Sequence, residues 1–265
     1  MIILMSMKKI ALILGLLIIW TVIGLTAQTA ADHLRAGDAL FARFDDADAL
    51  AEYEKAATLD PGNFAAQWKT ARGYMNLGDR VDYGQKGHEQ KQQTFYRAGE
   101  VFLRKALNLD PRDSCVRFLN AAFLGRLARA MSRKQQITVA SAIKAEIDRA
   151  LALDPANDMA WHGLAYWHRT LAEVGGAARF FGGLLFGKIP NGSLEEAVAD
   201  FQKAINLNPG FCNHHIELAR TYIALKKRDM AIAELQTGLA CPDTTSQCAH
   251  YKERARRMLA RLEKG

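Results

Sequence analysis

The sequence predicts an all-α superhelix of about five helix pairs that ends in a capping helix, and three observations support this fold class. A seven-residue pattern with a closing proline recurs four times along 265 residues. The chain has only six prolines and few runs of β-branched residues, which favours helices over strands. Hydrophobic residues make up 49% and charged residues 24%, a globular composition that excludes a disordered chain, a collagen-like fibre and a disulfide-dense miniprotein.

The N-terminal residues 1–31 have the features of an export signal. Lys8 and Lys9 precede eighteen uncharged residues, 10–27, and small or polar residues follow. A signal-peptide apolar region has about 7 to 15 residues and a membrane span about 20, so a cleaved signal peptide and an N-terminal membrane anchor are both open. The lysines would keep the N-terminus in the cytoplasm. We therefore expect a periplasmic protein, or one anchored in the inner membrane and facing the periplasm.

Four near copies of one motif organise the rest of the chain. They are KAATLDP at 55–61, KALNLDP at 105–111, RALALDP at 149–155 and KAINLNP at 203–209. Each copy is expected to end the second helix of a pair: the small alanine lets two helices approach, the leucine fills the seam, and the proline stops the helix. A recurring unit of this kind is typical of a solenoid.

First helices of the pairs carry a second pattern, in which an aromatic or histidine residue is followed by small and apolar ones. It is seen as Trp68-x-x-Ala71, Trp161-x-x-Leu164-Ala165 and His215-x-x-Leu218-Ala219. Here the chain resembles the tetratricopeptide repeat, a helix-turn-helix unit of about 34 residues. We expect repeats at about 32–63, 64–111, 112–157, 158–209 and 210–243. The intervals between motifs exceed the standard length, so insertions are expected between paired helices, at 79–93, around 131–138 and at 173–192.

The last insertion, with residues 174–190 at its centre, is strongly apolar. Five of the seven residues 180–186 are large and apolar, and glycines surround them. Two interpretations are open: the segment fills the interior of the solenoid, or it forms a lid or membrane-touching loop that shelters an acyl chain. After it, Ser193 is predicted to cap the next helix, with Glu196 reaching back. The apolar residues are Phe180, Phe181, Leu184, Leu185 and Phe186.

A final helix over 245–264 is expected to cap the superhelix. Its apolar stripe is Cys248, Tyr251, Ala255, Met258, Leu259 and Leu262, and basic residues dominate the rest. The alternative is a basic amphipathic helix that lies on anionic lipid.

Several segments resemble the regulator of microtubule dynamics family. They are the stretch LFGKIPNGSLEEAVAD at 185–200, the stretch WKTARG at 68–73 and residues 159–173. The resemblance covers about residues 33–263 and implies a noncatalytic helical-repeat protein. Animal members are associated with microtubules, mitochondria and organelle contact sites, and a tetratricopeptide domain of one member binds phospholipid. The N-terminus differs and resembles a bacterial export signal, so the chain is interpreted as an exported, bacterial-type member.

The concave face of such a superhelix is the expected ligand groove. Its polar candidates are cationic or neutral, which favours an anion such as a peptide carboxylate or a lipid phosphate. The alternative is a solvated face whose charges pair with local acids. The candidates are Lys69, Asn76, Arg126, His162, Tyr166, Arg169 and Arg220, together with Phe41, Phe123, Ile216 and Ile223.

No sequence motif indicates catalysis. The chain lacks the His-Glu-x-x-His and Cys-x-x-Cys metal motifs, a serine nucleophile elbow, a P-loop and a dinucleotide fingerprint. His162 and His168 are six residues apart on a helix and do not share a face, so neither a metal nor a cofactor is expected. The net charge is +7, and without Lys8 and Lys9 it is +5, too diffuse to indicate nucleic acid.

The cysteines offer one disulfide. Cys241 and Cys248 bracket a short loop and are predicted to pair in an oxidising compartment, pinning the cap to the last repeat, while Cys115 and Cys212 stay buried thiols. The sequence thus predicts an interaction scaffold that binds a protein or peptide partner in its groove. The alternative is a phospholipid-binding or lipid-transfer protein that uses the apolar insertion and the groove arginines.

Overall fold

The computed structural model describes residues 28–82, 84–175 and 189–264. Within these ranges the chain forms eleven α-helices and no strand, which confirms the all-α class. The predicted export segment at 10–27 lies outside the described residues. The same is true of the predicted apolar residues Phe180, Phe181, Leu184, Leu185 and Phe186.

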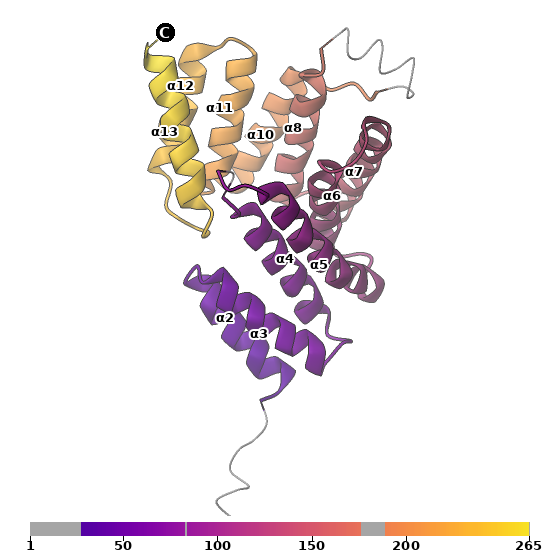
Figure 1. The fold of residues 1–265 in the computed structure, drawn as a ribbon. Helices are drawn as coiled ribbons and strands as arrows, with labels where there is room; N and C mark the ends of the chain where they lie inside the picture. Colours follow the sequence, from indigo (N-terminus) through magenta and orange to yellow (C-terminus); the bar gives the residue numbers. More distant parts are fainter. Residues whose placement is uncertain (1–27, 83, 176–188, 265) are drawn as a thin grey trace, which may run out of the picture.

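The helices pack as consecutive antiparallel pairs that wind into one superhelix (Figure 1). A final helix, α13, packs on the last pair. The pairs are α2 (Ala30–Ala42) with α3 (Asp46–Leu59), α4 (Phe64–Asp79) with α5 (His88–Leu109), α6 (Ser114–Ala128) with α7 (Arg133–Leu153), α8 (Asp158–Ala172) with α10 (Leu194–Leu207), and α11 (Cys212–Ala224) with α12 (Arg228–Ala240), before α13 (Cys248–Lys264).

The recurring motif marks the junctions between pairs. The helices α3, α5, α7 and α10 each end two residues before the motif proline, as the sequence predicts. Two residues after three of these prolines, an Asn or Asp side chain caps the next first helix. Asn63 accepts from the amide of Ala66 at 3.1 Å, and Asp113 and Asn157 make the equivalent bond. One motif therefore stops one helix and starts the next.

The extra length of the second and third pairs differs from the prediction. Most of it extends the second helices: α5 has 22 residues and α7 has 21, whereas α3 and α10 have 14 each. The segment 133–138, expected in an inserted loop, is the first turn and a half of α7. It is helical because Ser132 caps that turn through a capping box with Gln135.

Motif alanines and leucines have opposite environments. Ala56, Ala106, Ala150 and Ala204 are fully buried, as close helix packing requires. The leucines three positions later are 39–56% exposed, so the prediction that they fill the seam is wrong. Each is the last residue of its helix and lies at the edge of the superhelix, as Leu59, Leu109, Leu153 and Leu207 show.

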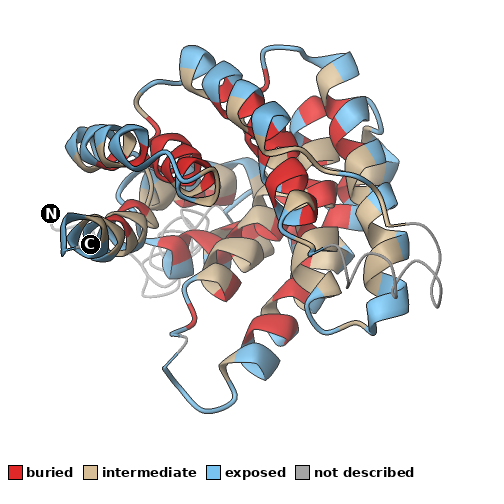
Figure 2. Cartoon of the chain, turned by 90° about the horizontal axis from the view of Figure 1, so that it is seen from above, coloured by how far each residue is buried: buried red, intermediate tan, exposed pale blue. Residues whose placement is uncertain are grey.

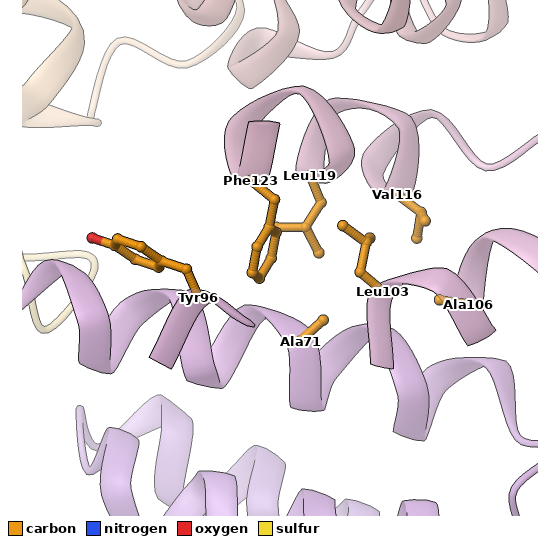
Figure 3. Packing of buried hydrophobic residues seen from close by; sticks show 7 residues of the cluster. All are labelled: Ala71, Tyr96, Leu103, Ala106, Val116, Leu119 and Phe123. Carbon is orange, nitrogen blue, oxygen red and sulfur yellow. The ribbon is translucent and has the colours of Figure 1, made fainter. Parts of the chain in front are cut away.

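The core runs between the helix layers, and the outer faces are exposed (Figure 2). In one cluster, Leu119 and Phe123 point from α6 toward Tyr96 and Leu103 of α5, and Ala71 of α4 lies beneath them (Figure 3). Burying a side chain of this size contributes about 1.5 to 3 kcal/mol. At the C-terminal end, the predicted stripe of α13 packs on α11 and α12, which supports its role as a cap.

Candidate functional site: a charge network on the inner face

First helices line the inner side of the superhelix. Each one contacts the next first helix directly, in the order α2, α4, α6, α8 and α11, whereas the second helices of successive pairs do not contact one another in the described part of the chain. Because the inner arc of a curved array is the shorter one, direct contact between successive first helices places them on the concave face. The charged side chains that join them therefore belong to this face.

Two of the first helices, α2 and α4, each carry a Gly-Asp pair whose aspartate forms an ion pair with the next first helix. A Cβ atom at Gly37 would lie 2.5 Å from the ring of Tyr53, so glycine is needed for the tyrosine to pack there. The same tyrosine donates a hydrogen bond to Asp38 at 2.9 Å. Lys69 of the next first helix then donates to both oxygens of Asp38, at 2.6 and 2.7 Å. The first two repeats are thus joined by an ion pair that a tyrosine positions.

The second repeat uses the same device. A Cβ atom at Gly78 would lie 2.4 Å from the Tyr96 ring, and the Tyr96 hydroxyl donates to Asp79 at 2.8 Å. Arg126 of α6 donates two parallel hydrogen bonds to the Asp79 carboxylate, and the one from Nε to Oδ1 is 2.8 Å long. Burial disfavours the charge of Arg126, but the neighbouring Asp79 carboxylate outweighs it and raises the pKa of the guanidinium. This bidentate pair fixes α4 against α6.

One glutamate forms ion pairs with three arginines at the C-terminal end of the inner face. Glu217 of α11 is buried, with 3% of its side chain exposed, and we call this residue with Arg169, Arg220 and Arg254 the Glu217 cluster. Arg169 donates to the Glu217 backbone carbonyl at 2.8 Å and to its carboxylate. Burial by itself would raise the pKa of Glu217, but Arg169, Arg254 and Arg220 lower it to about 2. The carboxylate is therefore charged, and the cluster keeps a formal excess of two positive charges.

Two arginines of the cluster remain accessible to solvent. The side chains of Arg220 and Arg254 are 37% and 33% exposed, whereas Arg169 is buried. Tyr166 is 42% exposed and lies near two arginines of the cluster. Its ring centroid is 5.1 Å from the Arg169 guanidinium, and it interacts electrostatically with Arg220. An exposed aromatic ring thus lies beside guanidinium groups that keep unused N–H donors.

A buried histidine pair lies beneath the cluster. His162 Nδ1 is 2.9 Å from His214 Nδ1, and His214 Nε2 is 3.0 Å from Asp158. If His214 donates to Asp158, its Nδ1 accepts a hydrogen bond from neutral His162, which satisfies both contacts. Burial, and then the charge of His214, lower the pKa of His162 to about 3. The pair joins α8 to α11 and is out of reach of a solvent-borne substrate.

The loop between α12 and α13, residues 241–247, reaches across to the first repeats. Ser246 donates a hydrogen bond to Asp46 of α3, a residue 200 positions earlier. Gln247 donates to Asn76 of α4 at 3.4 Å. Tyr251, in the first turn of α13, interacts electrostatically with Asp79, which together with burial raises its pKa. The C-terminal segment therefore closes one side of the inner face.

A sequence profile described as "Regulator of microtubule dynamics protein 1-3" matches residues 31–263, most of the chain. The chain belongs to this family. It is 24% identical to "Regulator of microtubule dynamics protein 1" of Caenorhabditis elegans over 161 residues, 61% of this chain and 71% of the worm protein. It is 23% identical to "Regulator of microtubule dynamics protein 2" of Homo sapiens over 198 residues, 74% of this chain and 47% of the human protein. The chain thus spans about half the length of its human relative.

Solved structures agree with the fold. A thermophilic TPR protein of Thermus thermophilus superposes with a TM-score of 0.58 at 16% identity, covering 88% of this chain and all of that one. A monomeric mutant of IFIT1 gives a TM-score of 0.52 at 16% identity, covering 89% of this chain and 56% of that one. At such low identity these likenesses show the fold alone, which is TPR-like.

Among the predicted groove residues of this family member, two apolar ones are misplaced. Phe123 and Ile216 are buried in the core and do not line the groove. Phe123 faces α5, the second helix of the preceding pair, because a Cβ atom at Gly99 of α5 would lie 2.8 Å from its ring. A shift of one residue along a helix turns a side chain by about 100 degrees, so register across insertions decides such assignments.

The polar groove residues are accounted for by specific partners. Lys69, Arg126, Arg169 and Arg220 all pair with carboxylates, which is the alternative that the sequence left open. His162 is buried on His214, Asn76 accepts from the α12–α13 loop, and Tyr166 is exposed. Sequence reasoning missed Glu217 and Arg254. The i, i+3 spacing of Glu217 and Arg220 on α11 was the available signal.

Other local predictions need correction. Ser193 caps α10 as expected, but its hydroxyl contacts Glu195, while Glu196 lies 3.0 Å from His168. All four cysteines are free thiols, so the predicted bond between Cys241 and Cys248 is absent. Cys115 is exposed, contrary to the prediction that it is buried.

Residues 28–82, 84–175 and 189–264 contain no group of three or more His, Cys, Asp or Glu side chains arranged to hold a metal ion. None of the helices in these ranges is both long and apolar enough to cross a bilayer.

Proposed function

We propose that this family member is a noncatalytic interaction scaffold whose inner face binds a protein or peptide partner. The observation that carries the proposal is the Glu217 cluster, in which three arginines share one carboxylate. Two of them, Arg220 and Arg254, keep about a third of their side-chain surface exposed. The partner group that fits is a carboxylate, from an acidic side chain or a chain end.

The charge balance supports an acidic partner. Each guanidinium has five N–H donors, and Arg220 uses only Nη1 to donate to the two carboxylate oxygens of Glu217. A second carboxylate can therefore accept bonds from Arg220 and Arg254 without displacing the first. Charge-assisted bonds of this kind are roughly twice as strong as neutral ones. The other ion pairs of the inner face each join one cation to one carboxylate, Lys69 to Asp38 and Arg126 to Asp79.

The surroundings suit a peptide more than a small substrate. Tyr166 offers an exposed aromatic ring next to the cluster, and Ile223, one turn beyond Arg220 on α11, is also exposed. Aromatic, arginine and apolar side chains together are the composition of protein-binding surfaces. His162 and His214 are buried, so this pair contributes to packing and not to the exposed surface.

Site-specific photo-cross-linking in the producing cells tests the proposal. A benzophenone amino acid at position 166 should capture a discrete protein band, because it lies beside the cluster on the inner face. The matched control is the same amino acid at position 153, an exposed leucine at the outer edge. Equal capture from both positions, or from neither, contradicts binding on the inner face.

Phospholipid binding remains the second candidate, because the sequence at 174–190 is strongly apolar and arginines also bind phosphate. Native mass spectrometry of protein purified without detergent distinguishes the two. If a phospholipid copurifies with the wild type and is lost in an Arg220→Gln variant, lipid binding would replace peptide binding as the proposed function. A peptide scaffold is expected to give protein without a lipid adduct.

We also propose that the protein acts outside the cytoplasm, in the periplasm or anchored in the inner membrane facing it. The support is the apolar run 10–27 that follows Lys8 and Lys9. The intact mass of the mature protein tests this. A start near Asp32 indicates a released periplasmic protein, an intact Met1 in the membrane fraction indicates an anchor, and an intact chain in the cytoplasmic fraction contradicts both.

A further inference from the structure

Three cysteines meet where α11, α12 and α13 come together. Cys212 and Cys248 are the first residues of α11 and α13, and both are fully buried in the same apolar cluster with Ile216 and Leu235. Cys241 follows the last residue of α12 and is partly exposed. The two helices that carry Cys212 and Cys248 pack directly against each other.

Burial distinguishes one pair among the three thiols. Cys212 and Cys248 both belong to the fully buried part of one apolar cluster, and Cys241 only packs against it. The Cys241 thiol instead donates toward two carbonyl oxygens, of Thr237 at 3.4 Å and of Pro209 at 3.7 Å. The sequence placed Cys248 with Cys241 because they are close along the chain. The fold instead buries Cys248 in the same cluster as Cys212.

The two paired thiols have unequal acidities. Burial raises the pKa of Cys212, and the neighbouring Cys248 thiol raises it further. Burial acts the same way on Cys248, but hydrogen bonds from the Thr245 side chain and from the backbone amides of Thr245 and Thr244 outweigh it and lower the pKa. The Thr245 hydroxyl lies 3.4 Å from its sulfur. The cation of Lys252 also interacts with both thiols.

We propose that Cys212 and Cys248 form a reversible dithiol–disulfide pair that locks α13 to α11. The oxidant is a disulfide-bonded compound. The Cys248 thiolate attacks it, forms a mixed disulfide and expels one donor thiolate; the Cys212 thiolate then attacks the Cys248 sulfur and expels the second. Two protein protons leave with the two donor thiols, and the two electrons lost by the protein reduce the donor.

The oxidant reaches Cys248 by local opening at the start of α13. The residues just before this helix, Pro242, Asp243 and Thr244, are exposed, and helix ends open more readily than core segments. The bond would join α13, which carries Arg254, to α11, which carries Glu217. It would therefore hold the C-terminal segment against the inner face in oxidising conditions. The pair stands independently of the proposed partner.

Peptide mapping of the full chain after incubation with oxidised glutathione tests the pairing. Trypsin releases Cys212 in residues 204–220 and both other cysteines in 229–252, and cleavage before Asp243 then separates Cys241 from Cys248. The expected product joins 204–220 to 243–252 and is two hydrogens lighter than the sum of the two peptides. Any other pairing, glutathione adducts alone, or three unmodified thiols overturns the proposal.

A stability readout with matched variants completes the test. Closing a loop from residue 212 to 248 should raise the Tm of the wild-type protein by about 5 to 10 °C on oxidation. Cys212→Ala should abolish this rise and leave Cys248 as a glutathione adduct, while Cys241→Ala should keep both the rise and the cross-linked peptide. Loss of the rise in Cys241→Ala alone contradicts the pairing. The wild-type peptide map decides the question by itself if a variant fails to fold, as judged by circular dichroism.

Discussion

Replacing Glu217 by glutamine perturbs the inner face at one atom and leaves the side-chain volume unchanged. Its carboxylate is 3% exposed and faces Arg169, which is equally buried. Removing one partner of a buried ion pair costs about 3 to 5 kcal/mol, because the other charge is left in a site of low polarity. Glutamine keeps one acceptor oxygen, so Glu217→Gln should cost about 3 kcal/mol and lower the Tm by about 6 to 12 °C.

Urea unfolding followed by circular dichroism at 222 nm and pH 7.5 measures this loss. The control is Glu253→Gln on α13, whose side chain is 54% exposed and lies 3.6 Å from Arg256. Exposed pairs contribute little, so the control should change the free energy of unfolding by less than about 0.5 kcal/mol. Adding Arg169→Met to Glu217→Gln should recover part of the loss. A loss below about 1 kcal/mol in Glu217→Gln would refute the view that the cluster holds α8, α11 and α13 together.

Three further predictions concern the other contacts. The pKa of His162 is about 3 when folded against 6.5 when unfolded, so stability present above pH 6.5 is lost as pH falls. Between pH 8 and 4.5 the wild type should lose about 2 to 3 kcal/mol more than His162→Phe in urea titrations, and parallel curves would contradict this. Gly78→Ala should cost about 1 to 3 kcal/mol by overpacking, whereas Gly210→Ala, with open space around it, should stay within about 0.5 kcal/mol; equal effects would be inconsistent with the close packing. Ser246→Ala with Gln247→Ala should speed amide hydrogen exchange in the α12–α13 loop and at the end of α4 but not in α7, and unchanged exchange would show that the bridge is not formed in solution.

The helices were predictable because their signals are local. A proline two residues after each second helix, a small alanine in each motif and an apolar stripe on the last helix all depend on neighbours a few positions away. The leucines before Asp-Pro were misjudged for the same reason. Their motif is local, but their exposure is set by where the next pair crosses, and that depends on loop geometry.

The site was harder to predict because its members are far apart in sequence. Arg169 meets a carboxylate 48 positions away, and Arg126 meets one 47 positions away. The bridge from Ser246 to Asp46 spans 200 positions, so only the completed superhelix brings those residues together. Residue type identified the cations, but not the carboxylates with which they pair. Which of these cations keep unused hydrogen-bond donors depends on the folded structure.

The central claim, that the accessible arginines around Glu217 receive an acidic partner, is tested most directly by peptide binding to charge-matched variants. Fluorescence anisotropy of a labelled decapeptide of alternating Glu and Ser would be measured at about 0.15 M salt. Arg220→Gln with Arg254→Gln should weaken binding at least about tenfold, or about 1.4 kcal/mol. Arg256→Gln with Arg257→Gln removes the same net charge from the outer face of α13 and should stay within about twofold. Equal weakening by both pairs would contradict the account, because net charge alone would then explain the binding.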